Sequence, residues 1–476
     1  MRLHSSSASA RCCNLFCSSH KANARESEWK FQVPVKHKDL EFLIKRFAAP
    51  LTAVLLAVSP ICNPPGNTNK ERSFALVQVP NKPKPTLSFF LLGPKQSPCN
   101  WTGVTCNTRN KRVISINLSE GSLPSNLSKL IELRVLDLTS NKITGLVPKK
   151  LGDLKNLNIL NLGKNRLHGP IPPYLSNISS LTVLSLGTNF LSGPVPFELG
   201  RLQRLQVLDA TINNLTGEIP PSIYNTSSLE SLALASNSLC GQFPSNIGDI
   251  LPKLLVFNMF FNKFTGEIPA SLYNLTKIKV IRAAFNHLEG TITSGLGNLP
   301  FLEMYNIGFN LVKGRDQDLD SFIKSLSNSS QLDFLGFNGN LLEGVILVSI
   351  GNLSKTLSTL LMGGNRFSGK IPESIGYLTG LRLLNISDNS LTGEIPQDIG
   401  KLKDLQELEL ARNQLTGRIP DSIGDLGALN KINLAQNKLE GVIPPSFGNF
   451  KNMLYMDLSN NRLNGSIPNG VLNQPI

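Results

Sequence analysis

The sequence predicts an α/β repeat solenoid, and two observations predict it. First, an asparagine recurs through the chain in steps that are mostly 24 residues long, although two steps are 25 and one is 30. Second, apolar residues precede each asparagine in the pattern L-x-x-L-x-L-x-x-N, as from Leu133 to Asn141. A chain of 476 residues is too long for one compact core but is ordinary for a repeat array. The recurring asparagines are Asn141, Asn165, Asn189, Asn213, Asn237, Asn262, Asn286, Asn310, Asn340, Asn365, Asn389, Asn413, Asn437 and Asn461.

Each repeated residue type has a mechanical role. In Leu136-Asp137-Leu138 the alternation has period two, so the leucines point inward and Asp137 points outward from a short strand. The asparagine then turns the chain, and its amide satisfies backbone groups that the turn leaves unpaired. Gly145 suits a positive φ or a close approach between coils, and Pro148 prevents helix continuation on the outer side. The same glycine and proline recur as Gly169, Gly193, Pro172 and Pro196.

This period and consensus are the signature of leucine-rich repeats. We therefore predict a right-handed superhelix with a parallel β-sheet on its concave face and short turns or 3-10 helices on its convex face. A single coil cannot bury its leucines, so stacking must close the core. The predicted organisation is a poorly structured extension over residues 1–96, a cysteine-paired cap over 97–112 and about fifteen repeats over 113–476.

The amino-terminal extension holds most of the positive charge. Residues 1–98 carry 14 Lys or Arg and 5 Asp or Glu, whereas residues 99–476 carry 33 and 28 with both signs interspersed. A basic binding face is therefore absent from the repeat pattern, and we expect no nucleic-acid partner. The apolar run at 47–61 follows Lys45 and Arg46 as in a signal sequence, but it starts late in the chain. An internal signal-anchor, a later translation start, a misassigned start and a disordered extension all remain open.

Several motifs resemble one plant family. The segment Leu391 to Pro396, L-T-G-E-I-P, is similar to the plant-specific 24-residue repeat, and Cys99 to Cys106, CNWTGVTC, resembles the cap of plant leucine-rich-repeat receptor-like kinases and receptor-like proteins. The resemblance covers residues 97–476 and implies a Cys99–Cys106 disulfide with Trp101 packed over the first coil. Cys12, Cys13, Cys17, Cys62 and Cys240 have no assigned pairing.

A long coil from Lys313 to Leu332 is more specific, since it is similar to an insertion in the immune-receptor subgroup that includes the flagellin and elongation-factor sensors of plants. Other features depart from the family. The first coil is short and has Gly121 in place of asparagine, and Thr293 and Leu347 replace proline. The chain ends at Ile476 directly after a regular coil, which suggests a product truncated before transmembrane and kinase parts.

We expect no catalysis in this chain. The sequence has no kinase signature, no P-loop and no H-E-x-x-H motif, and its five histidines are scattered. No set of residues suggests a nucleophile, a base and an orienting group in one place. The prediction is therefore no catalytic residues, no metal site and no cofactor.

The candidate ligand-binding residues lie just before the asparagines, in a column of positions that we expect to point outward from the strands on the concave face. Phe261, Phe285 and Phe309 occupy three consecutive rungs of this column, with Phe260 beside them and Arg282 as an outward neighbour. Aromatic residues flanked by polar ones suggest an interaction patch, and the alternative is that the rings pack on one another. Glu407, Glu409 and Arg412 form a second candidate group, whose alternative is a solvated face.

Glycosylation sequons support a secreted surface. Any single N-x-S/T match is weak evidence, but as a set they favour the secretory pathway. Asn385 is expected to point outward on the concave face, where a glycan would block the nearby surface. The sequons start at Asn100, Asn117, Asn126, Asn177, Asn214, Asn225, Asn274, Asn328, Asn352, Asn385 and Asn464.

Together these features indicate the ligand-sensing extracellular region of a plant receptor-like kinase in defence or development signalling. The resemblance implies a peptide or protein ligand on the inner surface and a co-receptor kinase, at the plasma membrane's outer side or in the apoplast. Contact with a membrane would come through a missing carboxy-terminal part or a signal-anchor. The alternative is a stand-alone secreted binder, such as a decoy receptor or a cell-wall-enzyme inhibitor.

Overall fold

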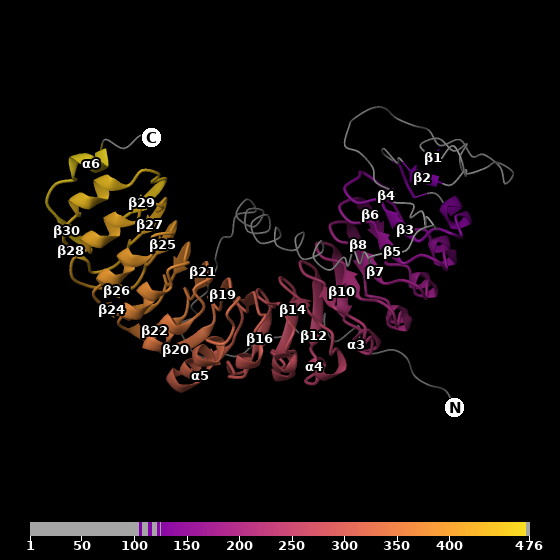
Figure 1. Ribbon diagram of the computed structural model, residues 1–476, viewed down its shortest axis with the longest axis horizontal. Helices are drawn as coiled ribbons and strands as arrows, with labels where there is room; N and C mark the ends of the chain where they lie inside the picture. The colour runs from indigo at the N-terminus through magenta and orange to yellow at the C-terminus, as the bar shows by residue number, and fades with distance from the viewer. Residues whose placement is uncertain (1–103, 107–112, 117–120, 124, 473–476) are drawn as a thin grey trace, which may run out of the picture. The chain divides into compact units, whose positions relative to one another are not determined.

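The described chain is a stack of parallel coils. The computed structural model describes residues 104–106, 113–116, 121–123 and 125–472. From β3 onward, one strand from each coil joins a 14-stranded sheet along the concave side, and short helices follow the convex side (Figure 1). This arrangement confirms the predicted solenoid. In chain order the sheet contains β3 (Val135–Asp137), β5 (Ile159–Asn161), β7 (Val183–Ser185), β9 (Val207–Asp209), β11 (Ser231–Ala233), β13 (Val256–Asn258), β15 (Val280–Arg282), β17 (Met304–Asn306), β19 (Phe334–Gly336), β21 (Thr359–Leu361), β23 (Leu383–Asn385), β25 (Glu407–Glu409), β27 (Lys431–Asn433) and β29 (Tyr455–Asp457).

A second set of parallel strands follows the turn asparagines. It forms sheets of seven, five and two strands. The first contains β4 (Thr144–Gly145), β6 (Arg166–Gly169), β8 (Phe190–Gly193), β10 (Asn214–Glu218), β12 (Ser238–Gln242), β14 (Lys263–Glu267) and β16 (His287–Glu289). The second contains β18 (Lys313–Gly314), β20 (Leu341–Val345), β22 (Arg366–Gly369), β24 (Ser390–Gly393) and β26 (Gln414–Leu415), and the third contains β28 (Glu440–Val442) and β30 (Arg462–Asn464).

Short helices form the convex side, mostly as single 3-10 turns. Most of them start after a proline in extended conformation, such as Pro148, because proline fixes φ and has no N–H to continue a helix. They are η3 (Ser125–Lys129), η4 (Lys149–Asp153), η5 (Pro173–Asn177), η6 (Phe197–Arg201), α3 (Pro221–Tyr224), α4 (Ile247–Ile250), η7 (Ala270–Asn274), η8 (Leu296–Asn298), α5 (Asp316–Leu326), η9 (Val348–Asn352), η10 (Glu373–Tyr377), η11 (Gln397–Lys401), η12 (Asp421–Asp425), η13 (Pro445–Asn449) and α6 (Asn469–Leu472).

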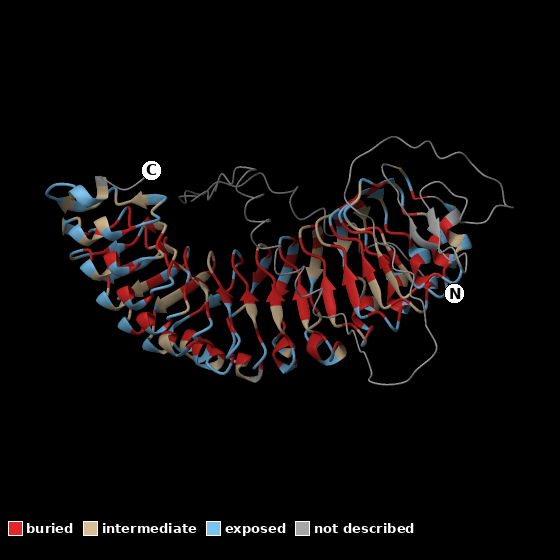
Figure 2. Cartoon of the chain, turned by 45° about the horizontal axis from the view of Figure 1, so that its top comes forward, coloured by how far each residue is buried: buried red, intermediate tan, exposed pale blue. Residues whose placement is uncertain are grey.

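The core is a continuous column of leucines and isoleucines. Leu136 and Leu138 are fully buried, as the alternating pattern predicts, and the buried strands run through the stack (Figure 2). The turn asparagines form the expected ladder. Asn165 Nδ2 donates to the carbonyl oxygens of Leu138, Leu162 and Gly163 at 2.8, 3.0 and 3.1 Å, and its Oδ1 accepts from Ile143 N at 3.0 Å. Each asparagine therefore links its own coil to the preceding one.

The residue before each asparagine lies in a left-handed turn and not in the strand, contrary to the sequence-based expectation. From Ser140 to Asn460 this column has φ between 53° and 65°, with glycine only at Gly339 and Gly364. Left-handed backbone is unfavourable for residues with a Cβ. Main-chain bonds to the next coil hold it in place, for example from Ser140 N to Gly163 O at 3.0 Å.

The first and the longest coils depart from the regular repeat. β2 (Val113–Ile116) pairs antiparallel with β1 (Val104–Cys106), so the parallel concave sheet begins only at β3. The insertion at 313–332 forms α5, an 11-residue amphipathic helix. Thr293, which replaces proline, hydrogen-bonds the buried hydroxyl of Tyr273, whose partner at 3.0 Å is Tyr305 Oη. The two tyrosines are buried, whereas Thr293 lies exposed beside them.

Candidate ligand-binding surface

Four phenylalanines gather on the concave face at β13, β15 and β17. We call Phe260, Phe261, Phe285 and Phe309 the aromatic cluster. The rings of Phe285 and Phe309 stack at 4.2 Å between centroids, and Phe260 meets Phe285 edge-on at 5.3 Å. Phe261 and Phe285 lie 6.0 Å apart. Such aromatic pairs contribute about 0.5–1.5 kcal/mol beyond their buried area. The rings therefore pack on one another as one unit.

The cluster has an exposed part and a buried part. Phe261 and Phe309 are 38% and 44% exposed, and Phe285 is half-buried. Arg282 was expected to point outward, but it is only 4% exposed, and Phe260 beside the row is 7% exposed. The guanidinium carbon of Arg282 lies 5.0 Å from the Phe260 ring centroid, and burial lowers the pKa of Arg282 to about 10. The buried Arg282 side chain thus packs against the Phe260 ring, the buried member of the cluster.

The left-handed turns set the spacing of the exposed rings. Phe261 N donates to Ala284 O at 2.9 Å, and Phe285 N donates to Gly308 O at 2.8 Å. Main-chain hydrogen bonds between neighbouring coils therefore fix the backbone positions from which the rings project. On one side the row meets Gly339, where an added Cβ would lie 2.6 Å from Phe309 Cδ1. The Phe309 ring covers this glycine, and the aromatic row ends there.

Charged residues occupy the same face at β23 to β27. We call Asp388, Glu409, Arg412 and Lys431 the acid–base region. Arg412 forms a two-pronged ion pair with Asp388, with Nη2 to Oδ2 at 2.7 Å, which raises the pKa of Arg412. Lys431 Nζ lies 2.6 Å from Glu409 Oε1. Two of the residues singled out from the sequence, Glu409 and Arg412, are thus brought into ion pairs whose partners, Lys431 and Asp388, sequence reasoning missed.

Sequence reasoning also missed a role for the outward strand position. Asp137 Oδ1 accepts hydrogen bonds from Thr139 N at 2.9 Å and from Thr139 Oγ1. Asn161 and Asn433 likewise cap the nitrogen two residues ahead. The recurrence of Asp or Asn two residues before Thr, Ser or Gly is the signal that could have revealed these turns. These hydrogen bonds fix the backbone at the end of each strand, and so they fix the direction of the residues that follow it.

The described sequon asparagines lie mainly on the convex side. Five of them occupy the same place in their coils, at or just after the short convex helix, and all five are exposed: Asn177, Asn225, Asn274, Asn328 and Asn352. Asn214 and Asn464 are exposed on the second set of strands, and Asn385 is half-buried on β23. Asn100 and Asn117 lie outside the described residues, as does Cys99, so the Cys99–Cys106 bond stays a prediction. Cys240 is disulfide-bonded.

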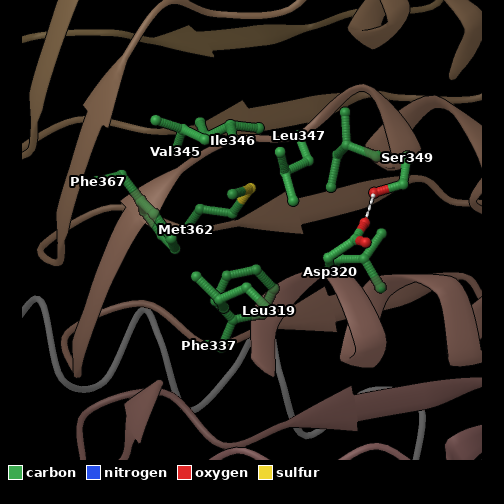
Figure 3. A pocket seen from close by; sticks show the side chains of 11 residues that line it. Leu319, Asp320, Phe337, Val345, Ile346, Leu347, Ser349, Met362 and Phe367 are labelled. Atoms are coloured by element: carbon green, nitrogen blue, oxygen red, sulfur yellow. Dashed lines mark hydrogen bonds between the residues drawn. The ribbon is translucent and has the colours of Figure 1, made fainter. Parts of the chain in front are cut away.

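A small apolar cavity lies under α5, away from the concave face. Leu319, Phe337, Met362 and Phe367 line it, and Asp320 bonds Ser349 Oγ at its rim at 2.9 Å (Figure 3). Its size suits roughly a single water molecule and not a peptide. Within the described ranges no group of three or more His, Cys, Asp or Glu side chains could hold a metal ion. No helix in that part of the chain is long and apolar enough to cross a membrane.

Comparison with known proteins supports the repeat assignment. Models of the leucine rich repeat match residues 131–191, 356–378, 380–402 and 405–463. The receptor kinase-like protein Xa21 of Oryza sativa subsp. japonica is 43% identical over 75 residues, which are 16% of this chain and 7% of that protein. The receptor-like kinase EFR of Arabidopsis thaliana is 43% identical over 65 residues, 14% of this chain and 6% of that protein.

A third relative belongs to another class. Chloroplastic cytochrome c6 of Arabidopsis thaliana is 59% identical over 66 residues, which are 14% of this chain and 38% of that protein. The c-type haem attachment motif C-x-x-C-H does not occur in the 476 residues.

Solved structures match most of the solenoid. A TDR receptor has a TM-score of 0.69 at 29% identity, over 76% of this chain and 62% of that one. The plant peptide hormone receptor RGFR1, solved in complex with RGF2, has a TM-score of 0.58 at 32% identity, over 79% and 66%. In all these comparisons the chain spans less than two thirds of its relatives' length. The protein is a leucine-rich-repeat solenoid similar to the ectodomains of plant receptor kinases.

Proposed function

We propose that this chain is the ligand-sensing extracellular region of a plant receptor-like kinase, and that it binds a peptide or protein ligand and catalyses nothing. The exposed aromatic cluster on the concave sheet is the observation that carries the proposal. Aromatic side chains held rigidly in a partly desolvated patch are the usual centres of protein–protein binding energy. The likeness to RGFR1, which was solved with RGF2 bound, supports a peptide as the ligand.

The cluster suits a ligand that lies along the sheet. The turn backbone fixes Phe261, Phe285 and Phe309 on consecutive rungs, about 4.8 Å apart. A row of rings at this spacing presents a preorganised apolar surface to an extended chain, and preorganisation lowers the ordering cost of binding. The chain works on the outer side of the cell, where the exposed convex sequons receive glycans. A co-receptor kinase is the second partner in this proposal.

Selection from a displayed library of random peptides tests the binding site. The full chain is used as bait beside the double variant Phe261→Ala/Phe285→Ala and the matched control Phe190→Ala, whose ring is 64% exposed on β8. Peptides selected on the unaltered chain should lose at least about tenfold in affinity on the double variant, since loss of a hot-spot side chain costs about 2 kcal/mol or more. The melting temperature should fall by only a few degrees. Equal binding to the unaltered chain and the double variant, or a large loss of stability in the double variant, would indicate that the rings serve packing and not ligand binding.

A further inference from the structure

We infer that Asn385 carries an N-linked glycan on the ligand-binding face, and that this glycan confines the ligand to the aromatic cluster. The inference rests on the proposed extracellular function. Asn385 is the last residue of β23, between Leu361 of β21 and Glu409 of β25 in the sheet register. It is therefore a sequon asparagine on the concave side, unlike the convex sequons.

The strand end holds the Asn385 amide in a defined orientation. Its Oδ1 accepts from Ser387 N at 3.0 Å and from Ser387 Oγ at 2.8 Å. Both contacts use the amide oxygen, and no described residue pairs with Nδ2, the atom that receives the sugar. The residue is half-buried on the strand face. A sugar on Nδ2 thus leaves every hydrogen bond of this turn intact.

The same turn occurs elsewhere on the sheet without a sequon. Asn161, Asn258, Asn306 and Asn433 also accept a hydrogen bond from the nitrogen two residues ahead. Their second residues are Gly163, Phe260, Gly308 and Ala435, none of which has a hydroxyl. Among the described strands of the parallel concave sheet, β3 to β29, Asn385 is the one such asparagine for which a hydroxyl residue completes the N-x-S/T requirement. Because Ser387 follows two residues later, the Asn385 side chain that caps the strand end is also an acceptor for N-linked glycosylation.

The position of the glycan divides the concave face. β23 lies three strands from β17, about 14 Å at the strand spacing, and one strand from β25, about 5 Å. A glycan on Asn385 would therefore stand over the acid–base region and leave the aromatic cluster open. A ligand that extends along the sheet from the cluster would meet the glycan at β23.

Peptide mapping of the full chain secreted from plant cells tests the modification. Enzymatic removal of glycans converts each occupied asparagine to aspartate, which mass spectrometry assigns to a position. We expect conversion at Asn385 and at the convex Asn225 and Asn352, which serve as controls for passage through the secretory pathway. Conversion at the convex sites without Asn385 would overturn the inference alone. No conversion at any site would overturn it together with the extracellular route.

A labelling experiment tests whether the glycan blocks the face. Cysteine is placed at Gln436, an exposed position of the left-handed column two coils beyond Asn385, or at the exposed convex Gln397 as control. The rate of modification by a polymer-linked maleimide is read at that residue by peptide mapping. Asn385→Gln and Ser387→Ala should each raise the rate at position 436 several-fold and leave position 397 unchanged, whereas Ser387→Thr keeps the sequon and the slow rate. Equal rates in all four backgrounds would overturn the blocking role.

Discussion

The aromatic cluster and the acid–base region both include residues of the left-handed column, but these residues carry apolar rings in the first and charged groups in the second. Phe285 and Arg412 have φ of 56° and 53°. Their main-chain nitrogens donate to Gly308 O at 2.8 Å and to Ala435 O at 2.9 Å. Below them, Asn286 and Asn413 make the same four hydrogen bonds at nearly the same distances. The backbone frame therefore does not depend on the side chain that it carries.

The residues that stabilise the fold are thus different from the residues that are available to bind a ligand. Buried leucines and asparagines repeat in every coil because each coil must close the core of its neighbour. The left-handed position faces outward and is free to vary, so phenylalanine, aspartate, arginine and glycine all occur there. Ligand chemistry can thus change along the sheet without a change in the fold.

The largest expected effect tests whether the frame is the same in both regions. Asn286→Ala and Asn413→Ala each leave three carbonyl groups and one N–H without their side-chain partner. Because an unsatisfied buried group costs about 1–3 kcal/mol, each variant should lose about 3 kcal/mol or more of unfolding free energy. Urea denaturation measures the loss, with the exposed Gln436→Ala as a control near zero. A loss in one region that exceeds the other by more than about 1 kcal/mol would contradict a common frame.

The fold was predictable because its rules are local and repeated. The period, the inward leucines and the asparagine ladder follow from the spacing of residue types, and the structure confirms all three. The long coil at 313–332 was visible as an insertion, although its helix was not specified. A repeat signal of this kind survives substitution in single coils, such as Tyr305 in a leucine position.

The candidate surface was less predictable because it depends on contacts between coils. The residues before the asparagines were assigned to outward strand positions, but they lie in left-handed turns, which main-chain bonds to the next coil impose. Arg282 alternates like an outward residue, yet it is buried under Phe260. Neither the burial of Arg282 nor the pairing of Arg412 with Asp388 can be read from one repeat alone.

An intermediate effect distinguishes the two surfaces by the way they are held together. Phe285 contacts three other rings, so Phe285→Ala should lose about 2 kcal/mol, with little dependence on salt. Arg412→Ala removes an ion pair that is open to solvent and should lose at most about 1 kcal/mol, less at high salt. Denaturation at low and high sodium chloride measures both. The distinction fails if the Phe285 variant proves salt-sensitive or if the Arg412 variant loses more.

The smallest effect concerns the cost of the left-handed position itself. A residue with a Cβ pays about 1–2 kcal/mol in this conformation, whereas glycine avoids that penalty but loses about 0.5–1 kcal/mol more in chain entropy. Glycine should therefore stabilise the fold by about 0.5–1 kcal/mol relative to alanine, and Gly339 and Gly364 already occupy the position at φ of 63° and 65°. The test compares Phe309→Gly with Phe309→Ala, and Arg412→Gly with Arg412→Ala, so that loss of the side chain cancels within each pair. Equal gains in both pairs would assign the strain to the frame. A gain confined to Phe309 would instead show that the left-handed backbone is strained in the aromatic cluster but not at Arg412. The candidate ligand-binding surface would then differ from the rest of the sheet in its backbone geometry as well as in its side chains.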